Sequence, residues 1–299
     1  MNAVNALSDA APDILTFKKE SRWKEVWRRL KKDRLAMFGL VVISFLILCA
    51  VLADLIVPYS VALKMAPKLK LAQPSAVHWF GCDGYGRDLL ARCLHGGRIS
   101  LLIGFATSIA TLIVGSLLGA LVGYVGGKLD DIVMRALDIF SAIPSTLFAM
   151  AVVAAMGSGI VNICIAISLT NIPGFVRIVR SSVLNIAEQE YIEAMRAGGA
   201  STLHILVKHV IPNSVGTLIV QTTANVASMI LSAATLSFLG LGINPPQPEW
   251  GALVSEGKEF LRTAPHLVLF PGVLICVASF SMSILGDGLR DALDPRLRT

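Results

Sequence analysis

Four residues with metal-binding side chains, His78, Cys82, Cys93 and His95, stand close together in the sequence. Imidazoles and thiolates are the groups that hold zinc. However, their spacings, H-x3-C and C-x-H, differ from the pairs of C-x2–4-C and H-x3–5-H that zinc sites use. If the segment faces an oxidising compartment, Cys82 and Cys93 could instead form a disulfide. We therefore assign no metal site here, and whether the two cysteines are bridged stays open.

A second polar pattern lies within an apolar run. Its four members recur at i, i+4, i+7 and i+11, which places them on one face of a helix. Such a stripe could line a path for a polar solute, or it could form hydrogen bonds between neighbouring helices in lipid. The tentative translocation-path residues are Gln221, Asn225, Ser228 and Ser232.

A charged segment lies between two very apolar runs at residues 190–212, EYIEAMRAGGASTLHILVKHVIP. Good helix formers over 188–197 predict a short helix, which Gly198 and Gly199 should end by adopting left-handed backbone conformations. A second helix, capped by Ser201 or Thr202 and ended or bent at Pro212, should follow. It carries an apolar stripe of Leu203, Leu206, Val207 and Val210.

The first of these two helices has a composition that suits contact with another protein. Glu193 and Arg196 offer charge, while Ala194 and Ala197 are small enough for close approach. The alternative is a solvated loop between two membrane spans.

The sequence lacks the motifs of an energy-converting or hydrolytic enzyme. It contains no G-x-x-x-x-G-K-[ST] phosphate loop, no H-E-x-x-H pair and no convincing Ser/His/Asp arrangement. The apolar runs also carry no charge near their centres, where proton- or voltage-coupled proteins keep ionisable groups. We expect a chain that is not an enzyme and binds no cofactor of its own.

The composition is that of an integral membrane protein. Of the residues, 55% are hydrophobic and only 15% are charged, against roughly 25% charged in soluble domains. The mean hydropathy is +0.70. Uncharged runs of about 18 residues or more are candidate transmembrane helices. We predict an all-α membrane protein with six transmembrane helices, at about 35–57, 99–124, 140–156, 160–175, 214–239 and 266–285.

Six spans place both termini on one side of the membrane. That side holds most of the 26 Lys and Arg residues, so both termini and the segment 190–212 should be cytoplasmic by the positive-inside rule. The net charge of +6 therefore reflects membrane topology and lipid contact, and we expect no nucleic-acid partner.

The chain then divides into five predicted parts. They are a cytoplasmic tail with a Trp-containing amphipathic helix at 1–34, a first transmembrane helix at 35–58, an extracytoplasmic segment at 59–97, a transmembrane core at 98–288 and a cytoplasmic tail at 289–299.

Four stretches resemble one family of membrane proteins. The residues 193–200, EAMRAGGA, followed by Ile211-Pro212, resemble the "EAA" motif of permease subunits of bacterial ABC importers. The residues 81–88, GCDGYGRD, look like the G-T-D-x-x-G-R-D element of the dipeptide/oligopeptide/nickel permeases, with Cys82 in place of the usual Thr. The stretches 237–250 and 285–298, SFLGLGINPPQPEW and LGDGLRDALDPRLR, look like C-terminal signatures of the second, C-type subunit of that family.

This resemblance implies the permease fold of type I ABC importers, in the cytoplasmic (inner) membrane of a bacterium. The implied partners are a homologous second permease subunit, two cytoplasmic ATPases that bind ATP and Mg²⁺, and an extracytoplasmic substrate-binding protein. The segment at about 188–200 would be the coupling helix that is seated in an ATPase, with contacts from Glu193, Ala194, Arg196, Ala197 and Gly199.

Peptides are the first substrate class that the resemblance implies, and nickel complexes or glutathione-like compounds are alternatives. Two other classes of protein also fit the sequence. One is a channel or carrier that works without ATP, and the other is a membrane scaffold that recruits a cytosolic partner.

Overall fold

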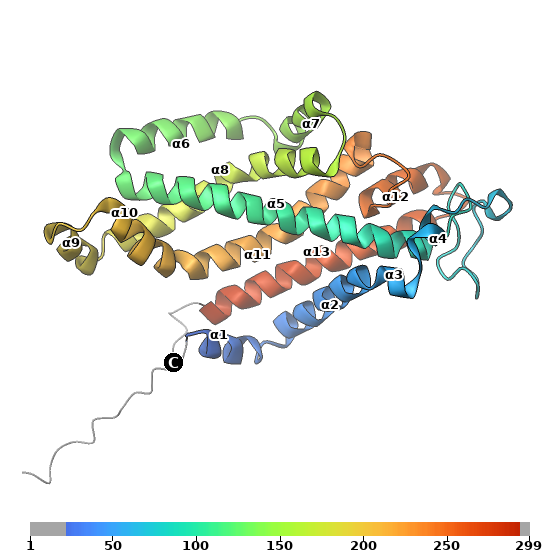
Figure 1. The fold of residues 1–299 in the computed structure, drawn as a ribbon, viewed down its shortest axis with the longest axis horizontal. Helices are drawn as coiled ribbons and strands as arrows, with labels where there is room; N and C mark the ends of the chain where they lie inside the picture. Colours follow the sequence, from blue (N-terminus) through green and yellow to red (C-terminus); the bar gives the residue numbers. More distant parts are fainter. Residues whose placement is uncertain (1–21, 294–299) are drawn as a thin grey trace, which may run out of the picture.

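The computed structural model describes residues 22–293, and this part of the chain is a bundle of long helices with no β-strand (Figure 1). The helices are α1 (Arg22–Leu30), α2 (Arg34–Val51), α3 (Ala53–Ile56), α4 (Tyr59–Leu63), α5 (Leu89–Val125), α6 (Gly127–Ser141), α7 (Ser145–Met156), α8 (Ile160–Ala187), α9 (Glu190–Ala197), α10 (Thr202–Ile205), α11 (Ile211–Leu236), α12 (Trp250–Gly257) and α13 (His266–Leu293).

Five helical segments within residues 22–293 are long and apolar enough to cross a membrane. Four are α2, α5, α8 and α13, and the fifth runs from α10 through α11 over Thr202–Leu241. The pair α6 and α7 passes the same test together, but it is bent by 86°. The expected count of six therefore holds only if this bent pair is one span.

The predicted span at 140–156, which Pro144 was expected to bend, starts later than predicted, and the chain does bend before it, by 86°. Residues 145–156 form α7, whereas Phe140 belongs to α6, and the chain turns between the two helices. Pro144 is the residue that caps the start of α7. A proline there has no N–H to lose from the helix, and it favours a new start over continuation of the preceding helix.

Two other prolines do not interrupt their helices. Pro173 lies inside α8, which runs on to Ala187. Pro212 lies in the first turn of α11, directly after a π-helical turn at Leu206–Val210 that joins α10 to α11. The helix was expected to end or bend at Pro212. It instead continues through this residue, after a wider π-helical turn just before it.

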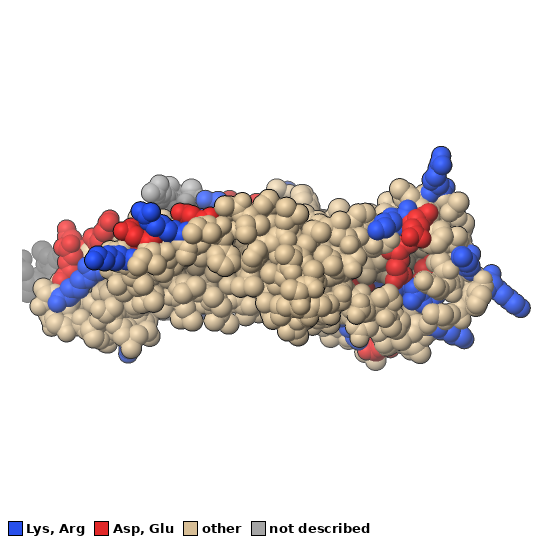
Figure 2. Space-filling view, turned by 90° about the horizontal axis from the view of Figure 1, so that it is seen from above, with Lys and Arg blue, Asp and Glu red and all other residues tan. Residues whose placement is uncertain are grey.

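On the face shown in Figure 2, charged side chains gather at the two ends of the bundle and leave a band without charges between them. One end carries α9 and α10, and the other carries α12 and the residues 57–88 that connect α3 to α5 (Figure 1). We refer to them as the α9 end and the α12 end. An uncharged band between two charged ends is the surface that a lipid bilayer requires.

Both described ends of the chain lie at the α9 end. Leu30 of α1 packs in the same buried cluster as Leu285 and Ala292 of α13. The last residue of α13, Leu293, comes close to Gly216 near the start of α11.

The helices α5 and α8 approach one another through glycines of α5. A Cβ atom on Gly119 would lie 2.8 Å from the carbonyl oxygen of Val176, and one on Gly123 would lie 3.0 Å from the carbonyl oxygen of Arg180. Small residues spaced by four allow two backbones to pack this closely in lipid, where packing takes the place of the hydrophobic effect. This contact sets the position of α8 and of α9, which follows it.

We expect Gly119→Ala to destabilise the subunit by about 1–3 kcal/mol. The added methyl group would meet the Cβ atom of Val179 at 2.7 Å and the carbonyl oxygen of Val176 at 2.8 Å, and neither lies at the flexible end of a side chain. Gly272→Ala in α13 is the matched control, since nothing lies within 4 Å of a Cβ atom there. The midpoint of thermal aggregation of the detergent-solubilised protein measures the difference. Equal midpoints for the two variants would contradict the close contact of α5 and α8.

Candidate functional site

The helix α9 projects from one end of the bundle and is fixed by a single buried side chain (Figure 1). Ile192 is completely buried, in a cluster that includes Val183 of α8 and Val210, which precedes α11. The side chains expected to contact an ATPase lie outside this cluster and are exposed. They are Glu193, Ala194, Arg196 and Ala197, and Gly199 after the helix is exposed as well.

Polar contacts tie α9 to two membrane helices. The Nε atom of Arg196 donates a hydrogen bond to the hydroxyl group of Tyr124 at 3.1 Å, and its guanidinium carbon lies 4.7 Å from the centre of the Tyr124 ring. The amide group of Asn213 donates to the hydroxyl group of Tyr191 at 3.2 Å. The helix is therefore joined to α5 and α11 as well as to α8, so that it moves with them.

Only one of the two glycines after α9 has the backbone conformation that glycine favours. Gly199 has φ +80°, whereas Gly198 has φ −75°, which any residue adopts. The N–H of Ala200 then bonds to the carbonyl of Met195. The expectation that both glycines end the helix by left-handed conformations is wrong for Gly198.

Ser201, one of the two residues expected to cap the second helix, does cap it. The apolar stripe of that helix, however, differs from the predicted one. The hydroxyl group of Ser201 accepts a hydrogen bond from the N–H of His204 and caps α10. Leu206 and Val210 are buried, whereas Leu203 and Val207 are 71% and 54% exposed. The π-helical turn shifts the register of the chain, since a wider turn changes which residues share a face.

The polar stripe on α11 makes its hydrogen bonds within its own helix. The amide nitrogen of Gln221 donates to the side-chain oxygen of Asn225 at 3.0 Å. The hydroxyl groups of Ser228 and Ser232 donate to main-chain carbonyls one turn earlier. Ser228 is exposed and the other three are partly exposed, so this face of α11 is not covered by the rest of the described chain.

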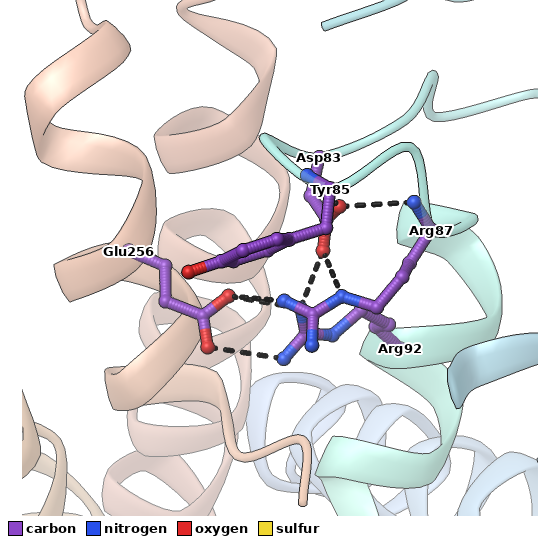
Figure 3. A network of polar contacts seen from close by, with 5 residues as sticks. All are labelled: Asp83, Tyr85, Arg87, Arg92 and Glu256. Carbon is purple, nitrogen blue, oxygen red and sulfur yellow. Dashed lines mark hydrogen bonds and ion pairs between the residues drawn. The ribbon is translucent and has the colours of Figure 1, made fainter. Parts of the chain in front are cut away.

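A buried network of charges lies at the α12 end (Figure 3). One carboxylate oxygen of Asp83 accepts hydrogen bonds from the main-chain N–H groups of Tyr85 and Arg87, and the other accepts from the guanidinium groups of Arg87 and Arg92. Glu256 of α12 accepts from both arginines, at 2.8 Å in each case. The Tyr85 ring lies over the Arg87 guanidinium group, 4.6 Å from its centre.

The charges in this network balance, two positive against two negative. The side chains of Arg87 and Arg92 are 2% and 0% exposed. Burial by itself would raise the pKa of Asp83, but the Arg87 N–H and the guanidinium groups of Arg92 and Arg87 hold that pKa below its usual value. The network therefore stays charged, and it fastens residues 83–87 to α5 and α12.

The signature around residue 250 makes a second contact between the same helices. Glu249 is buried, caps α12 through the N–H groups of Gly251 and Ala252, and accepts a hydrogen bond from the hydroxyl group of Ser100 on α5. The Trp250 indole donates to the carbonyl of Cys93 at 2.8 Å. Sequence reasoning did not assign a role to Glu249 or Glu256. The available signal was that Glu249 lies in the signature at 237–250 and Glu256 a few residues after it.

The histidines and cysteines considered for a metal do not converge. His78 pairs with Asp88 at 2.8 Å, and the Nε2 atom of His95 lies 2.8 Å from the carbonyl oxygen of Val57. The Cys82 and Cys93 thiols are not bridged. Burial raises the pKa of Cys82 to about 11, which keeps it protonated. Across residues 22–293, no three His, Cys, Asp or Glu side chains are placed to share a metal ion.

A helical bundle with an uncharged central band, one exposed helix at one end and a locked polar segment at the other defines a polytopic membrane subunit of the transporter-permease type. Residues 115–299 match the family described as "Binding-protein-dependent transport system inner membrane component", and residues 21–74 match the "N-terminal TM domain of oligopeptide transport permease C". The chain belongs to this family of ABC importer permeases, and as a transport component it is not itself catalytic.

Curated relatives match over nearly their whole length. The chain is 43% identical to the dipeptide transport system permease protein DppC of Alkalihalophilus pseudofirmus, over 93% of this chain and 91% of the relative. It is 40% identical to the glutathione transport system permease protein GsiD of Escherichia coli O6:K15:H31, over 99% and 96%. It is also 40% identical to GsiD of Pectobacterium atrosepticum, over 93% and 92%.

A solved structure has the same fold at lower sequence identity. An inward-facing conformation of the MetNI methionine ABC transporter matches with a TM-score of 0.59 and 20% identity, and the match covers 69% of this chain and 98% of that one. The match supports the permease fold alone.

We expect Gly199→Ala to weaken the end of α9 by about 1–2 kcal/mol, the cost of a left-handed conformation for a residue with a Cβ atom. Gly198→Ala is the control, because its φ is ordinary. Hydrogen exchange of the amides of residues 190–200 in the purified subunit measures the effect. Equal protection in both variants would show that the conformation of Gly199 does not matter.

We expect Arg92→Met to destabilise the subunit by about 3–5 kcal/mol, since the two carboxylates would then share one buried arginine. Adding Glu256→Gln to this variant should restore part of the loss because it restores the charge balance. Thermal aggregation midpoints of the single and double variants test this. A double variant that is less stable than the single one would contradict a network governed by its charge balance.

The pKa shift of Asp83 gives the same network a pH dependence. A lowered folded-state pKa stabilises the folded state above the usual Asp pKa. This stabilisation is lost as the pH falls through the lowered value.

Proposed function

We propose that this subunit belongs to an ATP-driven importer of peptides of the dipeptide/oligopeptide class, in the cytoplasmic membrane of a bacterium. The observation that carries the proposal is α9, a short exposed helix tied to three membrane helices. The dipeptide permease of A. pseudofirmus, 43% identical over 93% of this chain, supports the peptide class. ATP hydrolysis is then the work of partner ATPases, which hold the ATP and Mg²⁺.

In this proposal, α9 is the coupling helix and the α9 end is cytoplasmic. Exposed Glu193 offers a carboxylate to basic side chains or free amides of an ATPase, while Ala194 and Ala197 leave room for close seating. Arg196 is occupied with Tyr124, so its role is to brace the helix against α5. Gly199 provides the sharp return of the chain into α10.

Movement of the ATPases can reach the membrane helices through α9. Ile192 sits among residues of α8 and of the π-helical turn before α11. A displacement of α9 therefore has to displace these two helices, since a packed core does not deform continuously. Rotation of the spans would switch the access of the substrate path from one side to the other.

The uncovered polar face of α11 is the proposed lining of that path. Gln221, Asn225, Ser228 and Ser232 satisfy one another or their own backbone, and they lie open on the outside of the single subunit. A homologous second permease subunit, forming a heterodimer, would enclose this face. The α12 end would be extracytoplasmic and would receive the substrate from a binding protein.

Glutathione-like compounds are a second candidate class, because relatives named glutathione permeases are 40% identical over nearly the whole chain. Proteoliposomes that contain this subunit, its partner permease, the ATPases and the binding protein can separate the classes. Uptake of labelled dipeptides that depends on ATP supports the proposal. Uptake of glutathione alone, or uptake by this chain without ATPases, would overturn it.

We expect Glu193→Lys to abolish ATP-dependent uptake and stimulation of the ATPases by the loaded binding protein, while the subunit still inserts into the membrane. The change places a positive charge at the proposed contact. Asp131→Lys, the same charge change at an exposed position on α6 outside residues 188–200, is the control and should transport normally. Wild-type uptake and stimulation in Glu193→Lys would contradict the assignment of α9.

A further inference from the structure

A cavity of about 300 Å³ opens where the bent pair α6 and α7 crosses α8 (Figure 1). Its walls come from the break between α6 and α7 on one side and from the facing stretch of α8 on the other. The polar side chains among its lining residues are Ser141, Ser145, Thr170 and Arg177. Phe140 and Phe148 line the same space, with ring centres 5.5 Å apart and an edge-to-face orientation.

Arg177 is the one charged side chain that lines this cavity, and it uses only part of its hydrogen-bonding capacity. Its Nη2 atom donates to a carboxylate oxygen of Asp138 at 2.8 Å and to the Ser141 hydroxyl at 3.1 Å. Its Nε and Nη1 atoms make no hydrogen bond to any residue in the described part of the chain. A guanidinium group offers five N–H donors in a fork that fits a carboxylate, so donors remain for a ligand.

The neighbouring arginine shows the opposite arrangement. One turn further along α8, Arg180 binds Asp130 of α6 with both its Nε and Nη2 atoms, the former at 2.6 Å. That pair uses both carboxylate oxygens of Asp130 and already joins α6 to α8. Arg177, by contrast, contacts Asp138 through Nη2 alone and lines the cavity.

The position of Arg177 within a membrane protein makes the open donors significant. Its side chain is 38% exposed in the single subunit, and α8 is a candidate membrane span. Charged groups in such helices face water-filled paths or protein, because exposure to lipid is costly. The first turn of α7, which has no side-chain cap, borders the same cavity and adds positive potential there.

We propose that this cavity is a binding site for the carboxylate of a transported solute, with Arg177 as the residue that holds it. The inference rests on the proposed function as a solute permease and adds a site that the polar face of α11 does not include. A small peptide and glutathione both carry a terminal carboxylate, so the site suits both candidate classes. Asp138 competes with that carboxylate for the Nη2 atom of Arg177.

The competition gives a test that separates a binding site from a structural ion pair. Arg177→Gln and Asp138→Asn break the same pair and should have the same effect if the pair only holds α6 in place. If the cavity binds a carboxylate, the two variants should change the affinity for it in opposite directions. Arg177→Gln should weaken binding roughly tenfold, the loss of a hydrogen bond between charged groups. Asp138→Asn should tighten binding by roughly two- to fivefold, the size of an exposed charge interaction.

The measurement uses the assembled permease–ATPase complex in detergent without the binding protein, with dialanine as the probe. Ligand-detected NMR, with titration of the probe, gives the dissociation constant. Dialanine with an amidated C-terminus should bind at least roughly tenfold more weakly than dialanine to the wild type, and equally to Arg177→Gln. Arg135→Gln, an exposed arginine on α6 outside the cavity, is the matched control and should bind like the wild type.

Three results would overturn the proposal. They are no binding of dialanine to the wild type, equal effects of Arg177→Gln and Asp138→Asn, and binding of the amide as tight as that of dialanine. Addition of phosphatidylglycerol tests whether the cavity binds the anionic headgroup of a lipid instead. If this lipid displaces dialanine and is itself lost in Arg177→Gln, the cavity is a headgroup site and the proposal fails. ATP-dependent peptide uptake by proteoliposomes is measured separately, so a failure of the importer function is distinguishable.

Discussion

The close contact between α5 and α8 is the constraint on which the arrangement of the other parts depends. Lipid offers no hydrophobic gain for bringing two apolar helices together, so the contact relies on how closely the backbones can approach. Gly119 and Gly123 bring α5 against carbonyl groups of α8 itself. The position of α8 in turn places Arg180 and Arg177 opposite the carboxylates of α6, and it directs the chain into α9.

The two ends of the bundle are built in opposite ways. At the α12 end, Asp83, Arg87, Arg92 and Glu256 form a balanced and buried network. Such a network contributes less to net stability than to a defined geometry, since desolvation of the charges offsets most of their attraction. At the α9 end, α9 itself is held by single hydrogen bonds at the surface, and Ile192 is its one buried side chain. A rigid end and a lightly held end suit a protein in which one end is displaced by partners.

The parts that local chemistry determines could be predicted from the sequence. The apolar runs indicated the membrane helices, and the charged interruption with its glycines indicated the short helix before Gly199. Pro144 indicated a bend, but the sequence did not show that α6 ends there and α7 begins, because a proline alone does not say whether a helix bends or begins. Pro144 begins a helix, whereas Pro173 lies inside one. The π-helical turn before Pro212 was missed for the same reason, and with it the register of the following stripe.

The long-range contacts could not be predicted from the sequence. Nothing in the spacing of Glu256 or Glu249 shows that one meets Arg92 and the other meets Ser100, each more than a hundred residues away. These contacts nevertheless explain why separate short motifs occur in one chain. The motif at 81–88 and the one ending at Trp250 face the same part of α5, so each supplies half of one junction between α5 and α12.

The helices that hold α9 are also the helices that carry the candidate solute contacts. The cluster around Ile192 includes Val179 and Val183 of α8 and Leu218 of α11. Arg177 is two residues before Val179 in α8, and Gln221 is about one turn after Leu218 in α11. A shift of α9 therefore reaches both groups through directly packed neighbours. Since the rise of a helix is only about 1.5 Å per residue, each connection spans no more than about one turn, or 5.4 Å. If α9 is the coupling helix, as proposed above, its motion can reach the candidate solute contacts through rigid movement of α8 and α11, with no intermediate element.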